Sequence, residues 1–306
     1  MSKNHGVTNM NFDSARAGAV GGGLTRTLSF VALVCGTAII VFPLLWMVLV
    51  SLLSPDRAQA ATVSGDLSKL TSSDPQWNNF PDALSQMGSV RWKGFFDALA
   101  NSIVVTTLVV AGTVLSSSLV GFALARIRFR GNNALFLLML ATMMLPGQVT
   151  MIPLFLLFRN LGWVDTILPL VVPAFFGSAF FIFMYRQFIA QVPEALVEAA
   201  KVDGWGWFGI WWHVMLPLCR PVTAICAVFT FIFTWNDFLA PLIYLHSDDQ
   251  ATLAVALNSF RNQYGGVNKV NLLMAASLVT MIPCILLFLV AQRQFIEGLG
   301  KGAVKG

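Results

Sequence analysis

The chain contains few charged side chains and few of the residues on which soluble enzymes depend. Only 11% of its 306 residues are Asp, Glu, Lys or Arg, and it has three His and four Cys. The three His are far apart in the sequence and show no Ser-His-Asp or metal-ligand spacing. The Cys residues have no CxxC spacing and lie in or beside apolar runs. The sequence therefore predicts no catalytic residues, no metal site and no disulfide framework.

A nucleotide-binding motif is also absent. No GxxxxGK followed by Ser or Thr occurs, and the nearest run, GLGKGAVKG near the end of the chain, has the wrong spacing. We therefore expect the chain itself to bind no ATP and no other cofactor. Its net charge of +5 is modest, and it is better explained by the placement of Lys and Arg around a membrane than by binding to nucleic acid.

Apolar residues dominate the composition. Hydrophobic residues make up 57% of the chain, with 25 Phe and nine Trp, and the mean hydropathy is +0.73. A soluble domain of this length cannot bury so much apolar surface. The apolar runs are continuous and about 20 residues long, which predicts membrane-spanning helices rather than the alternating strands of a barrel. The sequence therefore predicts an all-α polytopic membrane protein.

Six segments are predicted to span the membrane: residues 28–53, 101–125, 134–158, 166–189, 221–245 and 270–292. The apolar core of the first segment is longer than the roughly 7–15 residues of a secretory signal peptide, so we expect it to be retained as a span. Residues 1–27 contain three consecutive Gly and few apolar runs, which predicts a loose tail. The predicted membrane domain covers residues 28–295 and is followed by a short tail at 296–306.

Lys and Arg are unevenly distributed between the two sides of these spans. Twelve of the 19 lie in the two tails and in the connections after the second and fourth spans. The other seven lie on the opposite side, four of them in the long loop at 54–100. Short loops rich in Lys and Arg remain in the cytoplasm. We therefore expect both termini and the loop at 190–218 in the cytoplasm, and the loops at 54–100 and 246–269 outside.

The loop at 190–218 contains a charged segment, EALVEAAKVDGWG at 194–206, which predicts a short amphipathic helix. Pro193 suits the first turn of a helix, and Gly204 suits the position just after its end, where φ is positive. Glu194, Glu198 and Lys201 share its charged face. The residues expected on its apolar side are Val192, Ala195, Leu196, Ala199 and Val202.

Four Trp residues follow this helix at positions 205, 207, 211 and 212. A cluster of Trp just outside a span favours the headgroup layer of a membrane. We therefore expect the helix to lie along the membrane surface, with Glu198 free to meet a partner. Ala199 and Ala200 have almost no side chain, so another surface can approach the backbone closely there. A solvated loop with interfacial aromatic residues is the simpler interpretation.

The same segment resembles a known motif. EAAKVDGWGWFGIWWHVMLPL is similar to the EAA loop of ABC importer permeases, in which EAA, a DG pair and a later LPL have this spacing. In this chain they are Glu198-Ala199-Ala200, Asp203-Gly204 and Leu216-Pro217-Leu218. The family usually has Ala at the position of Trp205 and Phe at the position of Trp211. Both departures add bulk to the loop.

Further segments carry the same resemblance. IPLFLLFRNLGWVDTILPLVVP at 152–173, TWNDFLAPLIYL at 234–245 and NSIVV at 101–105 resemble the carbohydrate-uptake branch of these permeases. QFIEGLGKGAVKG at the C-terminus resembles the tail of the smaller partner permease of the maltose type or glycerol-phosphate type. The resemblance covers about residues 90–306. It implies a type I ABC importer permease with six transmembrane helices and a cytoplasmic coupling helix.

In that family the loop docks into a cleft of an ATPase subunit. The resemblance therefore implies an ATPase-docking surface made of Glu198, Ala199, Ala200, Asp203 and Gly204. It also implies a complex in the plasma (inner) membrane of a bacterium, with a second homologous permease chain, two ATPase subunits forming a homodimer and an extracytoplasmic solute-binding protein. ATP and Mg²⁺ would bind to the ATPases. The implied cargo is a sugar or a sugar-like solute.

Asp237 is the only carboxylate well inside a predicted span. An ionisable side chain there is costly and is by default a hypothesis for a functional site. Together with Trp235 and Asn236, it is a candidate for lining the path of the cargo. The alternative is structural: Asp237 accepts hydrogen bonds from a neighbouring helix or lies near the outer interface. The sequence leaves both interpretations open.

An ion-coupled secondary transporter of a small polar solute is the alternative function. Such a protein is expected to show internal repeats and several charges inside its spans. The sequence shows one such carboxylate and no clear inverted repeat. These observations favour the ATP-driven importer.

Overall fold

The computed structural model describes residues 13–70, 74–88, 94–247, 249–263 and 269–303, and all regular structure in these ranges is helical, as predicted. Within these ranges, four helical segments are long and apolar enough to span a membrane, and they correspond to the first, second, fourth and sixth predicted spans. They are Arg26–Ser51 within α1 (Asp13–Ser51), α4 (Phe95–Arg126), Leu168–Ala190, and Val270–Gln292 within α15 (Val270–Ala303). Because α1 begins at Asp13, residues 13–27 are helical rather than loose. The rest of the expected N-terminal tail, residues 1–12, lies outside the described residues.

The third predicted span is bent, and a second bend lies just before the fifth. α5 (Asn132–Thr142) and α6 (Gly147–Asn160) meet at 98°, so the span predicted at 134–158 consists of two helices. Pro146 explains the break, because it lacks an amide hydrogen and its ring disfavours helical geometry at the preceding residue. The segment Trp207–Leu218 similarly meets α12 (Arg220–Trp235) at 81°. With each bent pair counted as one span, the described residues provide six.

Two spans are also interrupted along their length. α12 ends at Trp235, and α13 (Leu239–Tyr244) begins after a break of three residues, so the helix expected to continue to residue 245 is not continuous. The fourth span consists of α7 (Leu168–Val171), the 3₁₀ helix η2 (Val172–Phe176) and α8 (Ala179–Ala190). Interrupted helices are common at the binding sites of transporters, because unpaired backbone groups become available there.

Shorter helices occupy the connections. After α1 come α2 (Pro55–Val63), the 3₁₀ helix η1 (Leu67–Leu70) and α3 (Asn79–Gly88). Between α8 and α12 lie α9 (Glu194–Val202), α10 (Trp207–Gly209), the π-helix η3 (Ile210–Met215) and α11 (Leu216–Leu218). α14 (Leu253–Gln263) precedes α15.

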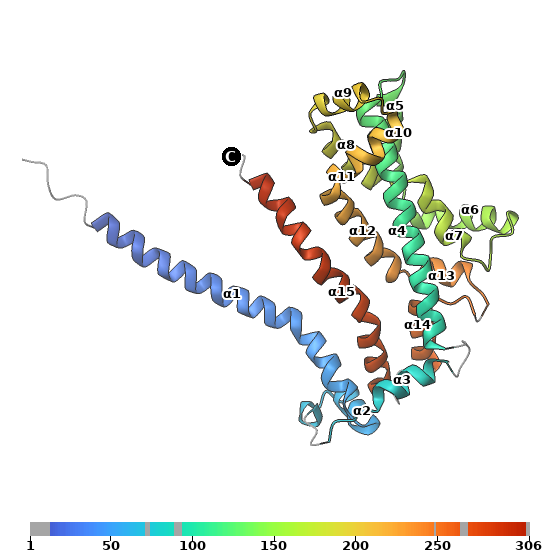
Figure 1. Cartoon of the computed structure of the whole chain (residues 1–306). Coiled ribbons are helices and arrows are strands. Elements are labelled where there is room, and N and C mark those ends of the chain that lie inside the picture. Colours follow the sequence, from blue (N-terminus) through green and yellow to red (C-terminus); the bar gives the residue numbers. More distant parts are fainter. Residues whose placement is uncertain (1–12, 71–73, 89–93, 248, 264–268, 304–306) are drawn as a thin grey trace, which may run out of the picture.

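The helices form a body around α4, which packs against α8 and α12 (Figure 1). α5, α9 and α10 lie at one end of this body, and α2 and α3 lie at the other. We call these the α9 end and the α3 end. α15 packs against α12, α3 and α1. α1 leaves the body at the α3 end and diverges from α15 towards its own N-terminus (Figure 1).

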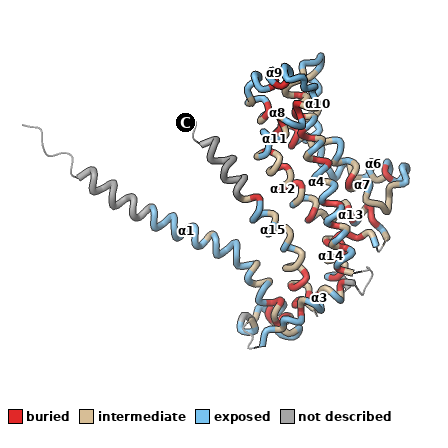
Figure 2. The backbone as a smooth tube through the Cα atoms, viewed as in Figure 1, coloured by how far each residue is buried: buried red, intermediate tan, exposed pale blue. Residues whose placement is uncertain are grey.

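In α1, residues 26–51 are mostly exposed, whereas buried residues concentrate in the body (Figure 2). In the most apolar 18 residues of the span Arg26–Ser51, only 6% of the residues are buried. Large apolar side chains such as Ile39 and Ile40 are 73% and 78% exposed. A helix of this kind is stable only in apolar surroundings, which lipid or another membrane-spanning chain provides.

The C-terminal end of α1 is held by a buried polar network. The Asn79 side-chain amide donates hydrogen bonds to the carbonyls of Ser51 and Leu53, at 2.8 and 2.9 Å. Its oxygen accepts a hydrogen bond of 3.0 Å from the side-chain amide of Asn271. Asn79 and Asn271 are 7% and 1% exposed. A single side chain thus links the end of α1, the start of α3 and the start of α15.

This network predicts that Asn79→Ala lowers stability by about 1–3 kcal/mol, because it leaves two buried carbonyls without a donor. Asn78→Ala removes the same amide from an exposed neighbour and serves as the matched control. Thermal unfolding of the purified protein in detergent measures the difference. Equal melting temperatures for the two variants would show that the network does not hold α1.

Candidate coupling site

α9 is a nine-residue helix with well-defined ends. Pro193 lies just before its first residue, and Gly204 follows with a φ of +85°. The amides of Asp203, Gly204 and Trp205 donate hydrogen bonds of 3.0 Å to the carbonyls of Ala199, Lys201 and Ala200, respectively. Only glycine adopts this left-handed conformation without steric strain, so Gly204 ends the helix as the sequence predicts.

The buried side of α9 differs from the predicted one. Val197 and Ala200 are buried, whereas Ala195, Leu196, Ala199 and Val202 are exposed. Val197 and Ala200 belong to the same apolar cluster as Ile189 of α8 and Ile210 and Met215 of η3. The prediction followed the side with more apolar residues. The fold instead buries two residues three positions apart, because these face α8 and η3.

The exposed side of α9 presents most of the predicted docking residues. Glu198, Ala199, Asp203 and Gly204 are all exposed. Val202 lies beside them and is 88% exposed, which is unusual for a Val. Ala200 instead faces the interior of the chain and is 6% exposed, so it supports the helix from within. The exposed residues of α9 and its C-terminal end thus combine small side chains with carboxylates and with the apolar side chains of Leu196 and Val202.

Arg126, the last residue of α4, ties that helix to the connection before α9. Its guanidinium donates to the carbonyl of Ile189 at 2.6 Å and to the carbonyl of Val192. The Ile189 carbonyl lies at the end of α8, where a positive charge is favourable, and the Val192 carbonyl lies just beyond it. Two hydrogen bonds from one planar guanidinium restrict the angle between α4 and this connection.

The connection after α9 is dominated by aromatic contacts. Lys201 Nζ lies 4.2 Å from the centre of the Trp207 ring. The Trp205 ring lies 4.5 Å from that of His213, centre to centre. A Cβ atom on Gly209 would lie only 2.5 Å from Cε3 of Trp205. The bulky Trp205 therefore fits because residue 209 is Gly.

A continuous apolar cluster connects α9 with the long helices. Besides Val197 and Ala200, it includes Phe122 of α4, Tyr185 of α8 and Cys226 of α12. Tyr185 is fully buried, and its hydroxyl donates a hydrogen bond of 3.0 Å to Thr223 of α12. Because close-packed interiors resist compression, a displacement of α9 reaches three membrane-spanning helices through this cluster.

The three residues predicted for the cargo path lie in different surroundings. Trp235 is buried, stacks on Phe231 at 5.3 Å and donates through Nε1 to the Thr280 carbonyl at 3.1 Å. Asn236 is exposed, and its amide donates to the Ile232 carbonyl of its own helix. Asp237 Oδ1 accepts the Ala240 amide at 3.3 Å, and Asp237 lines a cavity. The structure does not bring the three side chains together at one site.

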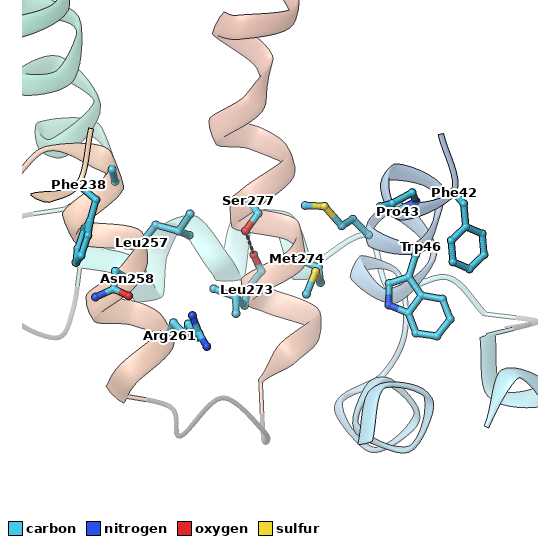
Figure 3. Close-up of a pocket in the computed structure, with 12 residues that line it drawn as sticks. Phe42, Pro43, Trp46, Phe238, Leu257, Asn258, Arg261, Leu273, Met274 and Ser277 are labelled. Atoms are coloured by element: carbon cyan, nitrogen blue, oxygen red, sulfur yellow. Dashed lines mark hydrogen bonds between the residues drawn. The ribbon is translucent and has the colours of Figure 1, made fainter. Parts of the chain in front are cut away.

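A wide groove of about 680 Å³ lies between α1, α14 and α15. Figure 3 shows side chains of α14, α15 and α1 following one another across it. The groove is mostly apolar, with Trp46 and Phe42 on the α1 side and Leu257 on the α14 side. Asn258, Arg261 and Ser277 are its polar residues. No sequence pattern indicated this groove, since it depends on how α1 leaves the body.

The chain matches the protein family described as "Binding-protein-dependent transport system inner membrane component" over residues 117–300. This match covers more than half of the chain, including α8, α9 and α12. The chain therefore belongs to that family.

Curated relatives and a solved structure agree with this assignment. The arabinooligosaccharides transport system permease protein AraQ of Halalkalibacterium halodurans is 35% identical over 285 residues, or 92% of this chain and 96% of AraQ. The melibiose/raffinose/stachyose import permease protein MelC of Bacillus subtilis is 33% identical over 69% of this chain and 76% of MelC. The sn-glycerol-3-phosphate transport system permease protein UgpE of Yersinia enterocolitica is 33% identical over 66% of this chain and 71% of UgpE.

The fold matches that of a chain in the crystal structure of a bacterial ABC transporter involved in the import of the acidic polysaccharide alginate. The TM-score is 0.74 with 22% identity, over 94% of this chain and 99% of the other. The chain is therefore a permease subunit of an ABC importer, as its sequence predicted, and not an ion-coupled secondary transporter.

The contact between Trp205 and Gly209 gives a prediction about the coupling loop. Gly209→Ala is expected to lower stability by about 1–3 kcal/mol, because the added methyl group overlaps the Trp205 ring. In a chain that already carries Trp205→Ala the overlap is absent, so adding Gly209→Ala there is expected to cost much less stability than it does in the wild type. Thermal unfolding of the wild type, the two single variants and the double variant measures this coupling. Additive losses in the double variant would contradict the proposed contact.

Proposed function

We propose that this chain is the non-catalytic translocation subunit of an importer that moves a sugar or sugar-like solute into a bacterial cell. Its partners are a second homologous permease, two copies of an ATPase subunit and an extracytoplasmic solute-binding protein. ATP and Mg²⁺ bind to the ATPases. The names of AraQ and MelC, which refer to oligosaccharides, support a sugar cargo.

The observation that carries this proposal is that α9 is packed against the membrane-spanning helices on one side and exposed on the other. α9 exposes Glu198, Ala199, Asp203 and Gly204, while its other side is packed into the cluster shared by α4, α8 and α12. Small exposed residues permit close approach of an ATPase surface, and the carboxylates offer partners for basic groups. In this arrangement, closure of the ATPases around ATP pushes α9, and the shared cluster transmits the push to the spans.

The distribution of basic residues supports an orientation in which the α9 end faces the cytoplasm. Arg126 ends α4, Arg128 and Arg130 lie between α4 and α5, and Lys201 lies on α9. By the positive-inside rule, this end is cytoplasmic, and both termini are on the same side. The α3 end then faces outward, towards the binding protein.

The second permease accounts for the exposure of α1. A single body of this size does not enclose a path for a sugar-sized solute, whereas two related chains facing each other do. The exposed apolar surface of α1 and the groove beside it give such a chain a large apolar contact area. Lipid covers whatever remains of α1.

Reversing the charge at α9 tests the docking surface. In Glu198→Arg, we expect the ATPase to be lost when the tagged chain is purified from its bacterium in mild detergent, while the second permease is retained. ATP hydrolysis by the purified sample is expected to fall in parallel. The matched control is Asp82→Arg, which reverses an exposed carboxylate at the α3 end. Retention of the ATPase by Glu198→Arg, or its equal loss from both variants, would contradict the proposal.

A further inference from the structure

A small cavity lies between α4, α7, the break after α12, α13 and the residues before α14. Its volume is about 150 Å³. This corresponds to about five water molecules at ~30 Å³ each, so it accommodates one end group of a sugar rather than a whole oligosaccharide. Its polar lining residues are Ser102, Thr106, Thr234, Asp237 and Thr252.

Two of these hydroxyl groups are buried and have no hydrogen-bond partner. Thr106 is 2% exposed and Thr252 is 6% exposed, and Oγ1 of each lacks a partner. An unsatisfied buried hydroxyl is costly, and in native proteins it generally meets water or a ligand. Ser102 already accepts the Leu253 amide at 2.7 Å and retains a hydroxyl hydrogen for another acceptor.

Asp237 adds a carboxylate to these hydroxyls. One of its oxygens accepts the Ala240 amide, which leaves further acceptor capacity. None of the described residues that line the cavity is basic, so no ion pair within the cavity accounts for the carboxylate. A carboxylate beside several hydroxyls suits a neutral group that both donates and accepts hydrogen bonds. It disfavours an anionic group such as a phosphate.

The position of the cavity points to transport. Asp237 lies in the break between α12 and α13, and Pro169 belongs to α7, in the interrupted fourth span. Two discontinuous spans thus border one polar cavity, an arrangement that transporters use for substrate sites. Ordinary packing between continuous helices would not require the interruption of both spans at this place.

We infer that this cavity is a subsite for one terminal hydroxymethyl group of the cargo, held by Thr106, Thr252 and Asp237 during translocation. The inference rests on the proposed sugar import. Because the subsite recognises a hydroxyl group rather than a particular sugar, it serves any cargo that carries one. Discrimination between sugars then falls to the binding protein and to the rest of the path.

The test uses the complete importer with its binding protein in proteoliposomes. Uptake is first measured for an arabinooligosaccharide, melibiose, raffinose and sn-glycerol 3-phosphate. Each compound that is carried is then compared with an analogue in which the terminal hydroxymethyl group is a methyl group. The readout is the ratio of the two uptake rates. The same binding protein is present in every assay, so its own preference cancels when variants are compared.

Thr106→Val and Thr252→Val remove a hydroxyl while nearly conserving volume. Each is expected to lower the preference ratio by roughly threefold to tenfold, the loss that follows from one hydrogen bond. Thr106→Ser is expected to keep the wild-type ratio. The control is Thr113→Val, a buried α4 residue that does not line the cavity, and it is expected to leave the ratio unchanged.

The outcomes separate the two proposals. If a compound is carried but both Val variants lower the uptake of cargo and analogue equally, the subsite is wrong and the cavity holds water or serves structure only. The proposed function then stands. If none of the compounds is carried in the presence of ATP, the proposed sugar import fails, and the subsite fails with it.

Discussion

The structure depends on the packing of Val197 and Ala200 beneath a short surface helix. A nine-residue helix is too short to be stable by its own hydrogen bonds, so tertiary contacts must hold α9 in place. These two side chains supply the contacts by joining α8 and η3 in one apolar cluster. Arg126 fixes the approach to the helix, and Gly204 fixes its end. Because α9 is held from its inner side only, its outer side remains free for a partner, and any force applied there acts on the cluster.

The interruptions of the other spans serve a different purpose. Between the rigid α9 end and the α3 end, α7 and α13 are short pieces of helix, and breaks beside them border the cavity at Asp237. Continuous helices would satisfy their own backbone groups and leave little polarity in the membrane interior. The fold thus has two distinct regions. Beneath α9, close packing can transmit a displacement. At the cavity beside Asp237, interrupted helices bring hydroxyl groups and a carboxylate together.

Much of this fold and part of the site were predictable from the sequence. The second and sixth spans, the helix at 194–202 and the role of Gly204 follow from apolar length and from the chemistry of Pro and Gly. The 98° angle of the bend at Pro146 could not be predicted, because the length of an apolar run does not determine how sharply the helix bends. The buried side of α9 was also missed, since Val197 and Ala200 are selected by neighbours distant in sequence. The fit of Trp205 against Gly209 and the cavity beside Asp237 likewise depend on tertiary contacts.

The two ends of the molecule are held by different interactions, and this difference bears on how the chain moves. At the α9 end, a shared apolar cluster and the hydrogen bonds from Arg126 to the carbonyls of Ile189 and Val192 hold α9 and the helices beneath it together, so they can be displaced as one rigid body. At the α3 end, the side-chain amide of Asn79 donates directional hydrogen bonds to the backbone carbonyls of Ser51 and Leu53, and its oxygen accepts one from the side chain of Asn271. Directional bonds weaken steeply with misalignment, so they keep the end of α1 in one position. In the proposed mechanism, a push at α9 displaces the body relative to the end of α1, which the hydrogen bonds of Asn79 hold in place. The cavity between α4, α7 and α13 lies between these two ends, where such a motion changes the relation of one broken helix to the next.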